Sequence, residues 1–353
     1  MKSKLDFQPK LMTALRGYSK ERFATDLLAG VIVGIVALPL AIAFGIASGV
    51  SPEKGLITAI IGGFIASLLG GCNVQIGGPT GAFIVIVYGI IQNFGLEGLA
   101  IATVIAGLIL VLMGALKLGT VIKFIPYPIV VGFTSGIALT IFTTQIKDLF
   151  GLTMEKVPAD FISKWIAYAG AIDTLNPWAL AIGVLSVVII AVSPKITKKI
   201  PGSLIAIIVM TIAAYLLRIY GGVTAIETIG DRFTIAAALP RPEPITFNME
   251  TINLLLPSAF TIAILGAIES LLSATVADGV TGDKHNSNTE LIAQGAANMI
   301  VPIFGGIPVT GAIARTMTNI NNGGRSPIAG IVHAAVLLLI LLFLGPLTKH
   351  IPM

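Results

Sequence analysis

The chain has 353 residues, of which 55% are hydrophobic and only 11% charged, and its mean hydropathy is +0.96. This composition excludes a soluble globular domain and indicates a multi-pass membrane protein. The single cysteine, Cys72, excludes an intramolecular disulfide and a cysteine-based metal cluster. The formal net charge of +5 comes mainly from segments predicted to face the cytoplasm, so nucleic acid is not an expected partner.

The N-terminal segment, residues 1–25, is polar and basic. It contains six basic residues: Lys2, Lys4, Lys10, Arg16, Lys20 and Arg22. Because segments rich in lysine and arginine stay on the inner side of the membrane, this segment is predicted to be cytoplasmic. The first predicted span, 26–48, has Pro39 in its middle, where a proline usually kinks a helix, and Phe44 follows the kink. The second predicted span covers 55–69.

An interrupted segment follows the second span. The stretch GGPTGAF at 77–83 places glycines and a proline directly before a short apolar run that ends near Ile91. A similar pattern, GGIPVTGAIA, returns at 305–314 in the second half of the chain. Matched interrupted helices in two halves of a membrane protein indicate an internal repeat, with a binding site where these helices meet.

The second interrupted segment also carries a charge. Proline is well placed in a first helical turn, so Pro308 predicts a helix that begins near Val309. The first N–H groups of such a helix lack partners, and inside a membrane they are tolerated beside a cavity or a ligand. A helix N-terminus favours an anion, and Arg315 adds a positive charge to the same run. This stretch therefore predicts an anion site.

The remaining spans are predicted from apolar runs at 99–116, 128–145, 178–192, 203–219, 251–277, 291–304 and 326–344, which with the two interrupted helices makes eleven helices. The proline-containing stretch 221–249 is predicted to be an extracytoplasmic excursion. In this topology the inner segments hold 13 lysines and arginines and the outer segments hold 8. This bias supports a cytoplasmic N-terminus.

Glu269 lies well inside the predicted span 251–277, where a carboxylate is costly unless it faces protein, water or a cation. Ser273 is one helical turn later on the same face. The two side chains are candidate ligands of a sodium ion, because hard cations prefer oxygen. A second interpretation makes Glu269 a proton carrier. In a third, Glu269 only neutralises Arg315 and holds two helices together.

Arg315 has two corresponding interpretations. As a ligand, its planar guanidinium suits a carboxylate or a sulfate ion; as a structural counter-ion, it pairs with Glu269. Phe44 and Phe83 are candidates for the wall of a pocket, although aromatic side chains in membrane helices more often serve packing. A polar inner loop is predicted to be a solvated connection, and it contains Asp278, Asp283, Lys284, His285 and Glu290.

The sequence offers little for catalysis. Its three histidines, His285, His333 and His350, are dispersed and lack the spacing of a metal site. It contains no GxSxG, HExxH or P-loop motif. We therefore expect neither an enzyme nor a cofactor, and no catalytic residue is assigned.

Four stretches carry a family resemblance: DLLAGVIVGIVALPLAIAFGIASG at 26–49, GGPTGAFIVIV at 77–87, LGAIESLLSATVADGVTGDKH at 265–285 and GGIPVTGAIARTMTNINNGGRSPIAGIVH at 305–333. In these stretches the chain resembles the SulP family of anion transporters, whose eukaryotic relatives include pendrin and prestin. The similarity runs from about Arg22 to the C-terminus. It looks most like the bacterial branch with dicarboxylate substrates and proton coupling, and bicarbonate and sulfate carriers are close relatives.

The resemblance implies an all-α SulP/UraA-like fold with seven-plus-seven inverted repeats, divided into a core domain that carries the substrate and a gate domain. The core corresponds to 26–120 (helices 1–4) and 250–353 (helices 8–11), and the gate to 121–249 (helices 5–7 and the outer loop). The family pattern continues with helices 12–14 and a cytoplasmic STAS domain, which are absent from this sequence, so we expect a truncation of a longer protein. A homodimer is also implied as a candidate assembly.

The resemblance also implies where the substrate binds. It places the anion between the N-termini of the third and tenth helices. The implied contacts are Phe44, Thr80, Gly81, Phe83, Gly311, Ala312, Ile313, Ala314 and Arg315. Glu269 matches the acidic coupling position, and Ser273 matches a hydroxyl ligand there. Because sodium-coupled bicarbonate relatives have Asp at the acidic position, Glu269 favours protons as the coupling ion.

We therefore predict a multi-pass protein of the bacterial inner membrane that transports small inorganic or organic anions. The first expectation is secondary-active, proton-coupled dicarboxylate uptake by an elevator mechanism, in which the core moves against the gate. The alternative is a sodium-coupled bicarbonate or sulfate transporter. An anion channel or a voltage-sensing motor fits the same fold but does not need Glu269. The expected partners are a small anion, a proton or sodium ion, and membrane lipid.

Overall fold

The computed structural model describes residues 7–122, 127–154, 157–158, 160–197, 202–233 and 238–353. The chain divides into two compact units: unit 1 comprises Met1–Phe133 and Leu239–Leu339, and unit 2 comprises Thr134–Ala238 and Ile340–Met353. Among the described residues, six helices are long and apolar enough to cross a membrane. The prediction of a multi-pass helical membrane protein is therefore confirmed.

Unit 1 begins with α1 (Lys10–Ala14) and the long helix α2 (Lys20–Ala47), which contains Pro39. The Ser19 hydroxyl accepts a hydrogen bond from Arg22 N (3.2 Å) and so caps the first turn of α2. The second predicted span is one continuous run formed by α3 (Pro52–Ile57), the π-helical turn η1 (Thr58–Gly62) and α4 (Gly63–Leu69).

The first interrupted segment contains a short strand, β1 (Gly77–Gly78), and a 3-10 turn, η2 (Gly81–Phe83). The following helix α5 (Ile84–Ala115) is broken at Gly95, whose φ of 68° and ψ of −170° are far from helical values. Glycine tolerates this left-handed backbone because it has no Cβ. The kink separates the predicted short helix from the span predicted at 99–116. The short helix α6 (Gly119–Ile122) follows.

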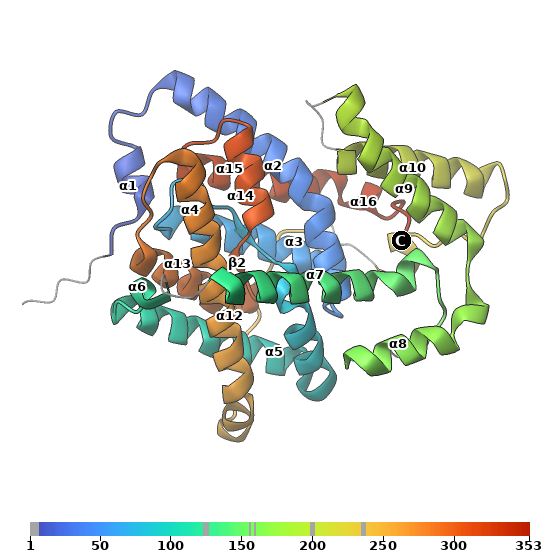
Figure 1. Cartoon of the computed structure of the whole chain (residues 1–353), viewed down its shortest axis with the longest axis horizontal. Coiled ribbons are helices and arrows are strands. Elements are labelled where there is room, and N and C mark those ends of the chain that lie inside the picture. Colours follow the sequence, from blue (N-terminus) through green and yellow to red (C-terminus); the bar gives the residue numbers. More distant parts are fainter. Residues whose placement is uncertain (1–6, 123–126, 155–156, 159, 198–201, 234–237) are drawn as a thin grey trace, which may run out of the picture. The chain divides into compact units, whose positions relative to one another are not determined.

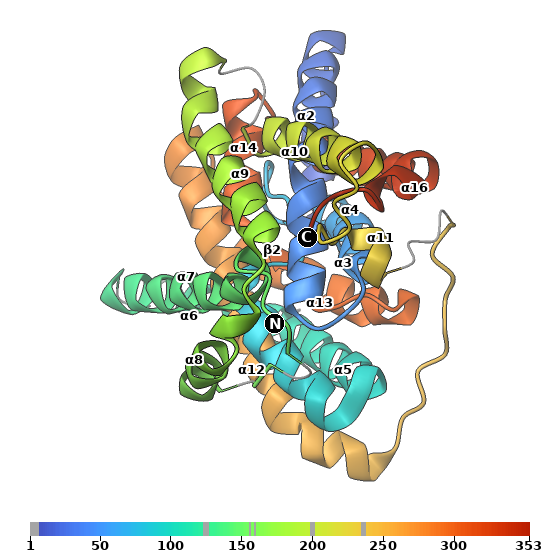
Figure 2. The same ribbon diagram turned by 90° about the vertical axis from the view of Figure 1, so that its right-hand side faces the viewer.

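The second half of unit 1 repeats this order of elements. Its helices are α12 (Met249–Thr281), α13 (Ser287–Ile300), the 3-10 turn η4 (Val301–Phe304), α14 (Ile313–Asn321) and α15 (Pro327–Leu339), with the strand β2 (Thr310–Gly311) before α14. Helices α14 and α15 pack against α2 (Figure 1), and α12 and α13 pack against α5, as the turned view of α5 and α12 also shows (Figure 2).

The apolar core of unit 1 lies between α5 and α12. Its fully buried side chains include Phe83, Val87, Leu110, Leu255 and Ile262. The contact between α2 and α15 is different, because it depends on small residues. A Cβ atom on Gly30 would lie 2.5 Å from the Ala329 carbonyl oxygen. Such close backbone approach is how membrane helices gain packing energy without a hydrophobic driving force.

Unit 2 contains the C-terminal part of α7 (Tyr127–Leu149), followed by α8 (Phe161–Gly170), the 3-10 turn η3 (Ile172–Thr174), α9 (Pro177–Ile196), α10 (Gly202–Ile219), α11 (Ile229–Arg232), η5 (Ile340–Leu344) and α16 (Gly345–Thr348). Helices α9 and α10 pack together. Helix α8 lies outside the predicted spans. It is capped by Asp160, which accepts a hydrogen bond from Ser163 N (2.9 Å).

An ion pair ties α11, inside the predicted extracytoplasmic excursion, to the C-terminal end of α10. Arg218 Nη1 and Nη2 donate to the Asp231 carboxylate at 2.6 and 3.1 Å. These hydrogen bonds lower the pKa of Asp231 to about 2 against the opposing effect of its burial. Asp231 also accepts a hydrogen bond from Thr228 N (2.8 Å) and closes the first turn of α11. The excursion therefore contains ordered structure.

Substitution of Gly30 tests the α2–α15 contact. Gly30→Ala is expected to lower the free energy of unfolding by about 1–3 kcal/mol, because the added methyl group overlaps the Ala329 carbonyl. Gly89→Ala on α5 is the matched control, since no heavy atom lies within 4 Å of its Cβ position. Denaturant unfolding of both variants in detergent measures the difference. Equal stability of the two variants would contradict this packing.

Candidate functional site

The two interrupted segments meet in the middle of unit 1. Strands β1 and β2 pair antiparallel, with Gly77 opposite Gly311 and Gly78 opposite Thr310. Ala312 N extends the pairing by donating to the Ile76 carbonyl oxygen at 2.9 Å. Segments more than 230 residues apart in the chain thus satisfy part of each other's backbone hydrogen bonding, as a membrane interior requires.

The predicted start of the second interrupted helix was wrong. Helix α14 begins at Ile313 instead of near Val309, and Ala312 is its N-cap residue. The reason is that Thr310 and Gly311 are extended in β2. The N–H groups before the helix also have side-chain acceptors: Ile307 N donates to Thr58 Oγ1 (2.8 Å), Val309 N to Asn298 Oδ1 (2.9 Å) and Gly311 N to Ser270 Oγ (3.1 Å).

Arg315 is buried beside this strand pair, with only 1% of its surface exposed. Its Nη2 donates to the Pro79 carbonyl oxygen, whereas its Nη1 has no hydrogen-bond partner in the described part of the chain. A Cβ atom on Gly78, whose φ is 151°, would overlap Nη1, so the guanidinium lies directly against β1. A buried cation with a free donor is expensive unless something binds it.

Glu269 and Arg315 do not form an ion pair among the residues that the structure describes. Glu269, half-buried on α12, instead accepts a hydrogen bond from Thr80 Oγ1 at 2.8 Å. The interpretation in which Glu269 neutralises Arg315 stays a prediction, because the two opposite charges are close enough to attract each other although they form no direct ion pair. The carboxylate is held at the start of the first interrupted helix, one residue beyond the carbonyl that Arg315 contacts.

Ser273 faces a different neighbour from Glu269. Its hydroxyl is fully buried and donates to Thr316 Oγ1 at 3.2 Å, which joins α12 to α14. No protein hydrogen bond of the described chain joins Ser273 to Glu269, and no cluster of three or more His, Cys, Asp or Glu side chains occurs there. A sodium site that uses both residues remains a prediction.

The other predicted contacts differ in their burial. Thr80, Gly81, Gly311 and Ala312 are buried at the crossing of the two segments. Phe83 is also buried, but it lies in the apolar core between α5 and α12. Three predicted residues have exposed surface: Phe44 and Ile313 are partly exposed and Ala314 is exposed. Phe44 lies on α2, which packs against α14.

Ser270 was missed by the sequence reasoning, although it is adjacent to Glu269. Its fully buried hydroxyl lies 2.6 Å from Thr310 Oγ1 and accepts a hydrogen bond from Gly311 N. Thr310 Oγ1 in turn lies 3.2 Å from the Gly266 carbonyl oxygen, to which it can donate. These contacts fix β2 to α12. A signal was present, because a serine inside an apolar span needs a partner.

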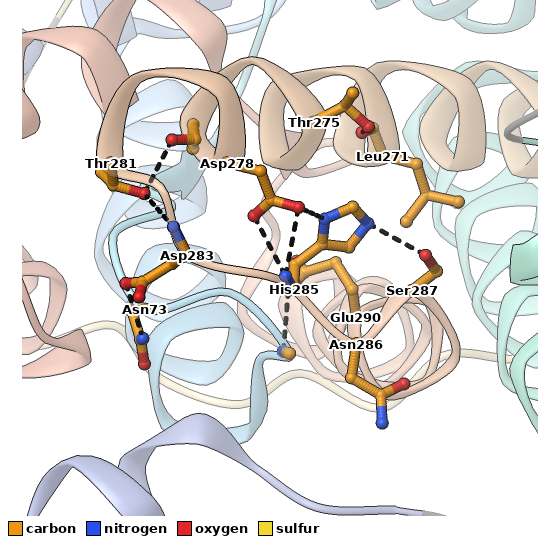
Figure 3. A network of polar contacts seen from close by, with 12 residues as sticks. Asn73, Leu271, Thr275, Asp278, Thr281, Asp283, His285, Asn286, Ser287 and Glu290 are labelled. Atoms are coloured by element: carbon orange, nitrogen blue, oxygen red, sulfur yellow. Dashed lines mark hydrogen bonds and ion pairs between the residues drawn. The ribbon is translucent and has the colours of Figure 1, made fainter.

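The predicted solvated loop between α12 and α13 was partly wrong. His285 Nδ1 lies 2.7 Å from Asp278 Oδ2, and His285 Nε2 lies 2.9 Å from Ser287 Oγ, in the network that Figure 3 shows. Glu290 is 1% exposed and accepts hydrogen bonds from Gly71 N, Gln75 Nε2 and Gln294 Nε2. Asp283 and Lys284 have the expected exposed positions, and Asp283 accepts a hydrogen bond from Asn73 (3.1 Å; Figure 3). The loop is a structured junction.

Comparison with known proteins assigns the family. The model of the sulfate permease family matches residues 23–353. The chain belongs to this family. It is 47% identical over 338 residues to the "Putative sulfate transporter YvdB" of Bacillus subtilis and covers 63% of that protein with 96% of its own length. It is 34% identical over 347 residues to the bicarbonate transporter BicA of Picosynechococcus, covering 59% of that protein with 93% of this chain.

Solved structures support the same fold. The transmembrane domain of a cyanobacterium bicarbonate transporter BicA matches with 32% identity and a TM-score of 0.83, over 95% of this chain and 85% of that one. Murine solute carrier 26 family member A9 matches with 20% identity and a TM-score of 0.87, over 98% of this chain and 60% of that one, and shows the fold alone. The predicted SulP fold is confirmed, and the family and these relatives are transporters by name. The chain spans about three fifths of the length of the two curated relatives.

Loss of the Ser270 hydroxyl tests how β2 is held. Ser270→Ala leaves Gly311 N without its acceptor and is expected to lower the free energy of unfolding by about 1–3 kcal/mol. Thr275→Ala on the same helix is the control, because Thr275 is exposed and its hydroxyl donates to the Leu271 carbonyl oxygen four residues earlier, within the same helix. Unfolding in detergent compares the two variants. A control that loses as much stability as Ser270→Ala would refute the special role of Ser270.

Proposed function

We propose that this chain binds a small anion at the crossing of β1 and β2 and belongs to the substrate-carrying part of a secondary-active anion transporter. The observation that carries the proposal is Arg315: a buried guanidinium, not ion-paired within the described chain, whose free Nη1 lies against β1. An anion that accepts a hydrogen bond from Nη1 would supply the missing partner and offset the cost of burying the charge.

The surrounding backbone favours the same kind of ligand. The nine-residue helix α14 has no side-chain cap at Ala312 and no acidic residue in its first turn. The first turn of α5 also lacks an acidic residue. Helix N-termini carry partial positive charge and unpaired N–H donors, so both interrupted helices stabilise an anion placed at their starts. Thr80, Gly81 and Ile313 are the proposed contacts beside Arg315, and Gly311 and Ala312, whose N–H groups bond to Ser270 Oγ and the Ile76 carbonyl oxygen, are proposed to line the site.

Sulfate and bicarbonate are the proposed substrates, because the named relatives are sulfate and bicarbonate transporters. A dicarboxylate, the first expectation from the sequence, stays a candidate, because each of its carboxylates presents a planar pair of oxygens to a guanidinium. Tetrahedral sulfate, planar bicarbonate and a dicarboxylate such as fumarate differ in charge and reach. A binding panel with these three anions therefore decides among them.

Glu269 is the proposed coupling residue. Its bond from Thr80 places a titratable group beside the proposed anion contacts without an ion pair to Arg315. Binding of a proton at this carboxylate would remove a negative charge near the incoming anion, which makes the two events cooperative. Sodium coordination by Glu269 is the alternative coupling. We further propose that unit 1 is the core of an elevator and carries the anion as one body.

Arg315→Lys tests the anion site while it keeps the positive charge. We expect sulfate affinity to fall about tenfold or more, because lysine lacks the planar fork. Arg325→Lys is the control: Arg325 is exposed, and its Nη1 donates to the Ile320 and Gly324 carbonyl oxygens. Titration calorimetry on the purified proteins measures both. Unchanged affinity in Arg315→Lys, or an equal loss of affinity in the Arg325→Lys control, would reduce Arg315 to a structural role.

Glu269→Gln tests coupling. In proteoliposomes, uptake of sulfate, bicarbonate or fumarate is expected to accelerate with an inward proton gradient, and Glu269→Gln is expected to abolish that acceleration. Glu250→Gln, at an exposed position in the first turn of the same helix, is expected to keep it. Dependence on a sodium gradient instead would assign the alternative ion. Flux through the unmodified protein that depends on neither the proton nor the sodium gradient would indicate a channel.

A further inference from the structure

Helix α13 carries a buried polar stripe that the proposed anion site does not include. Glu290, Gln294 and Asn298 follow one another at intervals of four residues, so they share one face of the helix. All three are at most 1% exposed. Three polar side chains in a row inside a membrane protein are costly unless each has partners, and their partners here are the two interrupted segments.

Glu290 holds the segment that leads into β1. Its Oε2 accepts a hydrogen bond from Gly71 N (2.8 Å), and its Oε1 accepts one from Gln75 Nε2 (2.9 Å). Gln75 also reaches the other segment, because a Cβ atom on Gly311 would overlap its amide nitrogen. Glu290 Oε1 accepts a further bond from Gln294 Nε2 (2.8 Å), which links Glu290 to the middle of the stripe.

Asn298 holds the segment that leads into β2. Its side chain forms two hydrogen bonds with the backbone of Val309: Nδ2 donates to the carbonyl oxygen at 2.7 Å, and Oδ1 accepts from the N–H at 2.9 Å. Asn298 Nδ2 also donates to the Gln294 carbonyl oxygen (2.8 Å). The amide therefore clamps the residue directly before Thr310.

We propose that Glu290 and Asn298, joined through Gln294, are positioning residues that set the register of β1 against β2 and thereby the geometry of the anion contacts. Strands of two residues each have too few bonds of their own to fix a register. One rigid helix that holds the residues before both strands supplies the missing constraint. The effect on anion binding rests on the proposed function, whereas the effect on the register of the strands does not.

The stripe also predicts which substitution is tolerated. Gln75 Oε1 and Gln294 Oε1 are buried and lack hydrogen-bond partners among the described residues. In Glu290→Gln, both amides can rotate by half a turn and present these oxygens to the new amide nitrogen, while Gly71 N keeps an oxygen acceptor. Glu290→Gln therefore removes the carboxyl group but keeps the contacts. Glu290→Leu removes both.

Asn298→Leu, with Asn288→Leu as its matched control, tests the proposal. Asn288 lies on the same helix and its Oδ1 accepts from the backbone N–H of Gly119 (3.1 Å), away from both strands. Hydrogen exchange of the folded, purified proteins needs no anion. We expect amides of 309–312 to exchange at least about tenfold faster in Asn298→Leu than in the unmodified protein. In Asn288→Leu, only amides near Gly119 are expected to exchange faster.

The second readout is the ratio of sulfate to bicarbonate affinity. It is expected to change about tenfold or more in Asn298→Leu and Glu290→Leu, and to stay constant in Asn288→Leu and Glu290→Gln, because only the first two move the strands. Equal exchange rates at 309–312 in the two asparagine variants would overturn the proposal. Faster exchange at 76–78 in Glu290→Gln than in the unmodified protein would also overturn it. If the unmodified protein binds none of sulfate, bicarbonate and fumarate, the proposed function fails, and the exchange result still decides the positioning role.

Discussion

The pairing of β1 with β2 is the interaction on which the site depends. A backbone segment that leaves the helical conformation inside a membrane protein must find other partners for its N–H and C=O groups. Here the two interrupted segments pair with each other, Gly77 opposite Gly311 and Gly78 opposite Thr310. Side chains of η1, α13 and α12 accept hydrogen bonds from Ile307 N, Val309 N and Gly311 N. The start of α14 and Arg315 are placed as a consequence.

Glycine is required at the crossing because other groups occupy the space of a side chain. The Arg315 guanidinium fills the Cβ position of Gly78, and the Gln75 amide fills that of Gly311. The same residues that interrupt the apolar pattern in the sequence thus admit the side chains of Arg315 and Gln75. This explains how a site of backbone donors and one arginine forms in so apolar a chain.

Much of this architecture could be predicted from local pattern. Apolar runs gave the spans, and the repeated glycine–proline pattern located both interrupted segments, since these signals are contained in short windows. The partners of those segments were not predictable in this way. Glu290 lies 215 residues from Gln75, and nothing in its own surroundings distinguishes a clamp from a solvated loop residue. Helix α8 was missed because it is short and lies outside the apolar runs.

The most direct test of the central claim is to locate a bound anion. Selenate is a sulfate analogue whose selenium scatters anomalously, so crystals of the protein soaked in selenate report its position. The structure predicts that the anomalous peak locates a selenate ion beside Arg315. Oxygens of this ion are expected within about 3.2 Å of Arg315 Nη1 and of N–H groups at the starts of η2 or α14. A well-occupied peak elsewhere, with Arg315 Nη1 bound only by protein groups, would contradict it.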